Sequence, residues 1–170
     1  MSITIKFYGD LRQKVPTEKK YNGIPSTLNI DIDKATLSVF DILKKFDIKE
    51  DEISHIFVNG KYCGPGKQIK DGDRIGLFPR RMGLIFLEIP QSHSIQATVK
   101  LFANLRQYSQ AISNLYLPEG STIESVIRKL RIPKDIGKLI IIVNGKPCYD
   151  KTLVIKNNDT LAIFPPLAGG

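Results

Sequence analysis

Apolar and polar residues follow one another in the same order twice along this chain of 170 residues. In the second half, alternation with a period of two and short β-branched runs predict four strands, at residues 97–103, 114–118, 139–143 and 160–164. In the first half the same patterns predict strands at residues 3–8, 28–32, 54–58 and 74–78. Between the second and third strand of each half, apolar residues recur at helical spacing and predict one helix.

Each predicted helix has one apolar stripe. In the second half the helix is expected to begin at a capping box that pairs Ser121 with Glu124, and to end before Pro133. In the first half the helix is expected over residues 37–46. The two stripes have the same spacing and consist of Val39, Ile42, Leu43 and Phe46 in the first half and Ile123, Val126, Ile127 and Leu130 in the second. A helix with a single apolar face covers one face of one sheet.

Three blocks of sequence occur twice, in the same order, so the chain is an internal duplication. Their spacings are 94, 85 and 86 residues, which predicts a longer hairpin loop in the first copy, within residues 15–29. The blocks are IKFYGDLRQ (5–13) with VKLFANLRQ (99–107), VNGK (58–61) with VNGK (143–146), and IKDGDRIGLFP (69–79) with IKNNDTLAIFP (155–165).

The order strand, strand, helix, strand, strand predicts an α+β fold, with two tandem β-grasp (ubiquitin-like) domains. A right-handed crossover through the helix places the first and last strands of each mixed sheet side by side. The expected domains are residues 1–83 and 97–170. Residues 84–96 join them, and the apolar run from Leu84 to Ile89 predicts a packed connector rather than a flexible tether.

Composition narrows the class of protein. Hydrophobic residues make up 42% and charged residues 25%, as in globular proteins, and no apolar run is long enough to span a bilayer. No signal peptide is recognisable at Met1, so we expect a cytoplasmic protein without a membrane partner. The net charge of +8 favours acidic partners. Basic residues are not interleaved with aromatic ones along the sequence, which argues for a solvated lysine-rich surface and against nucleic-acid binding.

Few side chains suggest catalysis or ligand binding. His55 and His93 stand alone without the spacing of metal ligands, so no metal site is predicted. Cys63 and Cys148 occupy equivalent positions in the two copies, which favours a shared packing role. No cofactor-binding motif is present, and we expect no bound cofactor.

The end of the chain has an unusual pattern, FPPLAGG. Pro165 and Pro166 stiffen the exit from the last strand. Gly169 and Gly170 lack a Cβ atom, so this segment could pass through a narrow channel in a partner. The α-carboxylate of Gly170 is then an open acyl group that a partner enzyme could adenylate with ATP.

Residues 97–170 resemble the MoaD family, the small subunit of molybdopterin synthase, within the MoaD/ThiS group of sulfur carriers. The segments VKLFANLRQ, LPEGSTIESV, VNG and IFPPLAGG carry this resemblance. It implies that a MoeB/ThiF-like enzyme, using ATP and a sulfur donor, converts Gly170 to a thiocarboxylate. A MoaE-like large subunit would then take the sulfur for molybdopterin, the organic part of the molybdenum or tungsten cofactor. The chain would be a non-catalytic subunit and sulfur-donor cosubstrate rather than an enzyme by itself.

The resemblance also implies roles for the residues near Gly170. Gly170 would carry the sulfur and Gly169 would let the tail thread the channel. Residues expected to position the tail and bind the partner are Phe102, Phe164, Pro165, Pro166, Leu167 and Ala168. For Phe102 and Phe164 a second interpretation stays open, in which both are core residues of their strands.

The first copy resembles the family more weakly and is a degenerate MoaD-like domain in this interpretation. It has RRMGL at residues 80–84, so Leu84 stands where the second glycine belongs and the chain continues. Without a free carboxylate it is expected to act by contact alone. Two other functions stay open for Gly170: conjugation to lysines as a ubiquitin-like modifier, and ThiS-type sulfur transfer for the thiazole of thiamine.

Overall fold

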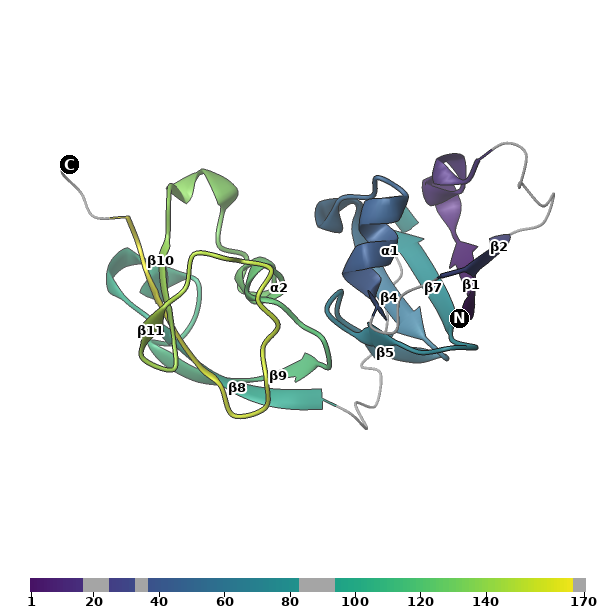
Figure 1. The fold of residues 1–170 in the computed structure, drawn as a ribbon. Helices are drawn as coiled ribbons and strands as arrows, with labels where there is room; N and C mark the ends of the chain where they lie inside the picture. Colours follow the sequence, from purple (N-terminus) through teal and green to yellow (C-terminus); the bar gives the residue numbers. More distant parts are fainter. Residues whose placement is uncertain (17–24, 33–36, 83–93, 167–170) are drawn as a thin grey trace. The chain divides into compact units, whose positions relative to one another are not determined.

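The computed structural model describes residues 1–16, 25–32, 37–82 and 94–166. The chain divides into two compact units, Met1–Ser92 and His93–Gly170. Figure 1 shows the first unit in purple to teal and the second in green to yellow. No helix in the described ranges is long and apolar enough to cross a membrane.

The first unit contains a mixed five-stranded sheet with the order β2-β1-β7-β4-β5. The first strand β1 runs parallel to the last strand β7, as predicted, and the other neighbours are antiparallel. Its helix is α1 (Val39–Lys45). The strands of the sheet are β1 (Ser2–Phe7), β2 (Ser26–Asp31), β4 (Ile53–Val58), β5 (Lys61–Cys63) and β7 (Arg74–Pro79). Shorter elements are the pair β3 (Leu37–Ser38) and β6 (Gln68–Ile69), and the 3₁₀ turns η1 (Gly9–Lys14), η3 (Glu50–Glu52) and η4 (Arg80–Met82).

The second unit repeats this layout with the order β11-β10-β12-β8-β9, and β8 runs parallel to β12. Its helix is α2 (Ile123–Lys129). The strands are β8 (Ser94–Leu101), β9 (Ile112–Pro118), β10 (Ile140–Val143), β11 (Lys146–Pro147) and β12 (Thr160–Phe164), and the 3₁₀ turns are η5 (Ala103–Gln107) and η6 (Lys134–Ile136). The prediction of two tandem β-grasp domains is therefore confirmed.

The core of each unit lies between one face of its sheet and its helix. Along β8 and β12 every second side chain is buried, because successive strand residues point to opposite faces. The residues of this kind in the second unit are Ala97, Val99, Leu101, Leu161 and Ile163, which form one cluster with Ile123, Val126 and Ile127 of α2. The predicted helix stripe is thus confirmed, and burying a side chain of this size contributes roughly 1.5–3 kcal/mol. We call the side of each sheet that faces away from its helix its outer face.

The predicted N-terminal cap of α2 is wrong by one residue. Thr122, not Ser121, is the cap: its Oγ1 accepts a hydrogen bond from the Ser125 backbone N–H at 3.1 Å. Ser125 Oγ in turn accepts from the Thr122 backbone N–H at 2.6 Å, which closes a capping box without Glu124. The Ser121 hydroxyl instead donates to the Pro118 carbonyl at 2.7 Å.

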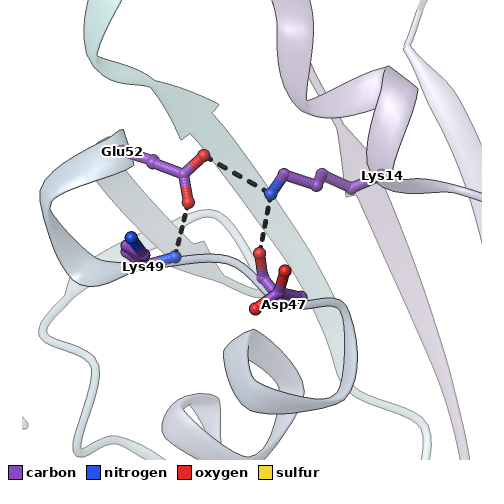
Figure 2. A network of polar contacts seen from close by, with 4 residues as sticks. All are labelled: Lys14, Asp47, Lys49 and Glu52. Atoms are coloured by element: carbon purple, nitrogen blue, oxygen red, sulfur yellow. Dashed lines mark hydrogen bonds and ion pairs between the residues drawn. The ribbon is translucent and has the colours of Figure 1, made fainter.

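Lys14 attaches η1 to the segment after α1, as Figure 2 shows. Its Nζ donates a hydrogen bond to the Asp47 carbonyl at 2.7 Å and lies 3.5 Å from Glu52 Oε1. Glu52 Oε2 accepts from the Lys49 backbone N–H at 2.7 Å. Partly exposed pairs of this kind contribute at most about 1 kcal/mol, so the contact positions η1 more than it stabilises the unit.

Parts of two predicted segments fall outside the described residues. Of the connector 84–96, only residues 94–96 are described, and they form the start of β8, where Ile95 pairs with Leu117. Of the loop predicted within residues 15–29, residues 17–24 are not described and β2 already begins at Ser26. A packed connector and a long loop therefore stay predictions.

Candidate functional site

The last strand of the second unit leads directly into the candidate carrier segment. β12 ends at Phe164, and Pro165 and Pro166 follow as half-buried residues outside regular structure. Four predicted site residues lie beyond the described range: Leu167, Ala168, Gly169 and Gly170. Their roles stay predictions, and the geometry below concerns what positions the chain up to Pro166.

Pro166 lies against Gly137, a residue that the sequence analysis did not single out. Gly137 follows η6 with φ +97° and ψ −167°, a conformation that essentially only glycine adopts. A Cβ atom at Gly137 would lie 3.0 Å from Pro166 Cγ. The bare backbone of Gly137 therefore allows Pro166 to approach closely as the chain leaves β12. The only signal in the sequence was a glycine soon after the helix-ending Pro133.

Phe102 and Phe164 are stacked on the outer face of the second unit. Their ring centroids are 4.0 Å apart and their planes differ by 14°. Both rings are half-buried and neither belongs to the core cluster, so the interpretation of both as core residues is wrong. The Phe102 backbone N–H donates to the Ile163 carbonyl at 3.1 Å, which ties the end of β8 to β12.

Further apolar residues share this outer face with the two rings. One register line across four neighbouring strands contains the apolar residues Ile142, Ala162 and Ile112, with the charged Lys100 between the last two. Ile140 pairs with Phe164. Exposure is 61% for Ile112 and 38% for Ile140, which is high for isoleucine. We call Phe102, Ile112, Ile140, Ile142, Ala162 and Phe164 the apolar face. Exposed apolar patches of this kind are typical of protein interaction sites.

Ala103 adjoins Phe102 in a strained backbone conformation. Its φ is +49°, in the left-handed region that non-glycine residues rarely adopt, and the equivalent residue of the first unit is Gly9 with φ +54°. The predicted strand 97–103 therefore extends too far at its C-terminal end, because the left-handed turn at Ala103 follows a strand that ends at Leu101, and β8 begins three residues earlier than predicted, at Ser94. Strain at a non-glycine residue is more common near functional sites than elsewhere.

The other candidate chemical groups do not form a site in the described ranges. There, no group of three or more His, Cys, Asp or Glu side chains could hold a metal ion. Cys63 is buried in its core, in line with the packing role predicted for it. Cys148 is only half-buried, and its Sγ donates to the Asp150 carbonyl at 3.3 Å. Hydrogen bonds from the Thr152 hydroxyl and backbone N–H lower the pKa of the Asp150 carboxyl.

The first unit repeats the stacked pair without a free chain end. Tyr8 and Phe78 have ring centroids 4.0 Å apart and planes 11° apart, as the counterparts of Phe102 and Phe164. Beyond β7 the chain continues through η4, which contains Arg80 and Arg81. Gly83 and Leu84 lie outside the described residues.

Two sequence families match the chain, one for each half. Residues 99–170 match the ThiS family, and residues 1–84 match the Mut7-C ubiquitin family. The molybdopterin synthase sulfur carrier subunit of Arabidopsis thaliana is 24% identical over 89 residues, which are 49% of this chain and 93% of the relative.

Solved structures of similar proteins include two from Haloferax volcanii. SAMP1 is 22% identical with a TM-score of 0.38, covering 44% of this chain and 99% of its own. The protein HVO 2177 is 20% identical with a TM-score of 0.43, covering 52% and 98%.

The fold and the family matches define a protein of two ubiquitin-like domains in tandem. The match of residues 99–170 to the ThiS family agrees with the resemblance of the second half to the MoaD/ThiS group. The first half, which was predicted as a degenerate MoaD-like copy, matches the Mut7-C ubiquitin family.

Proposed function

We propose that residues 97–170 form a sulfur carrier for molybdopterin synthesis, with Gly170 as the carrier residue. The ThiS match, which extends through the glycine pair to Gly170, is the observation that carries this proposal. The molybdopterin pathway is chosen because the Arabidopsis relative is a molybdopterin synthase sulfur carrier subunit.

In the proposed reaction a carboxylate oxygen of Gly170 attacks the α-phosphorus of ATP and pyrophosphate leaves. A hydrosulfide ion from the sulfur donor then attacks the acyl carbon and displaces AMP, which leaves a thiocarboxylate without any change of oxidation state. Sulfur passes from this group to the pterin precursor, and the carboxylate of Gly170 is restored by water. A partner enzyme of the MoeB/ThiF type would supply the ATP site and the sulfur donor.

The apolar face is the proposed docking surface for that enzyme and for a MoaE-like large subunit. It includes Ala162 and Phe164 of β12, the strand that leads into the carrier segment, so a partner bound there would receive the tail nearby. Apolar residues at the centre of an interface contribute most of its free energy. Pro166, which packs at Gly137, and the preceding Pro165 would restrict the direction in which the tail leaves the sheet.

The intact mass of the protein purified from its own cells tests the carrier chemistry. We expect a species in which one sulfur replaces one oxygen, lost on deletion of Gly169 and Gly170 while the fold is retained. Covalent adducts of Gly170 with lysines of other proteins, without a thiocarboxylate, would contradict the proposal and indicate a modifier. Transfer of the sulfur to a thiazole precursor but not to a pterin would indicate the thiamine pathway.

Variants of the apolar face test the docking surface. Ile142→Asp should weaken binding of the activating enzyme at least tenfold, because a carboxylate would be buried without a partner. The matched control is Phe57→Asp, at the equivalent position of the first unit, which should leave activation of Gly170 unchanged. Equal losses in both variants would refute a docking role specific to the second unit.

A further inference from the structure

The outer faces of the two units differ in chemistry although their backbones match. In the first unit Lys6, Gly76, Phe57 and Tyr62 lie in register across β1, β7, β4 and β5. The equivalent residues of the second unit are Lys100, Ala162, Ile142 and Pro147. Ile142 and Pro147 of the second unit thus correspond to the aromatic residues Phe57 and Tyr62 of the first, whereas the stacked pair is aromatic in both units.

A groove of about 420 Å³ lies on this face of the first unit. Gly76 is one of its lining residues, and a Cβ atom there would lie 3.3 Å from Phe78 Cε2 and 3.7 Å from Tyr8 Cε2. Because Gly76 has no side chain, the two rings can lie this close to its backbone. A volume of this size is within the range of small-molecule sites.

Aromatic side chains form the apolar part of the groove and hold one another in place. Tyr8 stacks on Phe78, and Phe78 meets Phe57 edge-on with centroids 5.5 Å apart. The ring centroids of Phe57 and Tyr62 are 5.8 Å apart, so the row of aromatic rings continues to the edge of the sheet. Rings fixed in this way offer a planar ligand stacking and edge contacts at little further cost in side-chain entropy.

The charged part of the groove is purely basic. Lys6 and Arg74 line it, from the neighbouring strands β1 and β7, and none of the described residues that line it is acidic. Within the described ranges neither side chain forms an ion pair with a carboxylate. Two cations on one small groove favour a doubly charged anion such as a phosphate monoester over a single carboxylate.

We propose that this groove of the first unit binds a planar aromatic ring carrying a phosphate monoester, the chemistry of a nucleoside monophosphate. The ring would lie over Gly76 among Tyr8, Phe57 and Phe78, and the phosphate would contact Lys6 and Arg74. This function is independent of the carrier chemistry of Gly170, and it gives the first unit a ligand of its own.

Titration of the full-length protein with AMP, followed by calorimetry and by backbone amide NMR shifts, tests the proposal. We expect a Kd below about 1 mM, with the shifts centred on β1, β4 and β7. Adenosine and inorganic phosphate alone should each bind at least tenfold more weakly, because each makes only half of the contacts.

Variants with matched controls in the second unit assign the site. Lys6→Gln and Arg74→Gln should each weaken AMP binding about tenfold, and Gly76→Val should abolish it by filling the groove. The controls Lys100→Gln and Ala162→Val should leave the Kd unchanged. Because Lys6 and Arg74 are at the surface, their variants test the site even if Gly76→Val does not fold.

Three results would overturn the proposal: no AMP binding at millimolar concentration, binding that the three groove variants leave unchanged, or equal losses in the controls. Binding of a single-stranded RNA oligonucleotide without binding of AMP would also overturn it, since the ligand would then be a polymer.

Discussion

Substitution of Gly137 by alanine should separate the stability of the second unit from the positioning of its carrier segment. Gly137 has φ +97° and ψ −167°, and its Cβ position lies 3.0 Å from Pro166 Cγ. Alanine therefore introduces two costs: a backbone conformation that disfavours a Cβ atom, and a contact that forces Pro166 to move.

The backbone cost is about 1–3 kcal/mol, from the conformational preference alone. Gly145 provides a matched control, because its φ is +81° and its Cβ position has no atom within 4 Å. Gly145→Ala should thus lose about 1–2 kcal/mol without touching the chain end. For a domain of this size each 1 kcal/mol lowers Tm by roughly 4–8 °C.

Two measurements distinguish the effects. Hydrogen exchange followed by mass spectrometry on the full chain should show lower protection of the second unit in both variants. The rate of Gly170 adenylation by the activating enzyme, measured below the unfolding temperature, should fall at least fivefold in Gly137→Ala only. If both variants keep the wild-type adenylation rate, or if the rate falls equally in both, the contact with Pro166 does not position the carrier segment and the reasoning is refuted.

Three further predictions concern single groups. Ala103→Gly should stabilise the second unit by up to about 1 kcal/mol in chemical denaturation, since φ +49° then costs nothing; a destabilised variant would show that Ala103 is unstrained. Thr122→Ala should destabilise the second unit by about 0.5–2 kcal/mol by removing the cap of α2, whereas Ser38→Ala should affect only the first unit. Burial lowers the pKa of His55, so the imidazole binds a proton less readily in the folded protein than in the unfolded protein. The free energy of unfolding of the first unit should therefore fall as the pH drops below about 6.5. The same pH dependence in His55→Gln would contradict this.

Much of the fold could be predicted because both halves of the sequence have the same order of strand and helix patterns. Regular alternation and helical stripes depend on local spacing alone, so the main strands and both helices were located within a few residues. The short strands β5 and β11 were missed, since two or three residues have no period and pair only because β4 and β10 already lie beside them. The cap of α2 was misplaced because the structure uses Thr122 and Ser125, and a serine at the third helical position is a weaker signal than glutamate.

The outer faces were harder to predict than the cores. Alternation along β8 places Val99 and Leu101 towards the core, and the next residue, Phe102, therefore points to the outer face. Because phenylalanine is often buried, the sequence alone left Phe102 open as either a docking residue or a core residue. In the first unit the sequence analysis found basic and aromatic residues separated along the chain. Strand register then brings Lys6 beside Gly76 and Phe57, residues that are up to 70 positions apart in sequence.

The duplication indicates where the two units diverged in function. Core positions keep their apolar character, as in Ile5 with Val99 and Leu77 with Ile163, because either sheet must bury the same face against its helix. Outer-face positions are free of that constraint, and there Phe57 corresponds to Ile142 and Arg74 to Thr160. An apolar surface on the strands next to the carrier segment suits the proposed protein partner, and a groove of aromatic and basic residues suits the proposed planar anion. Under these two proposals each unit binds through the same side of the same fold, and residues that its core does not need determine what it binds.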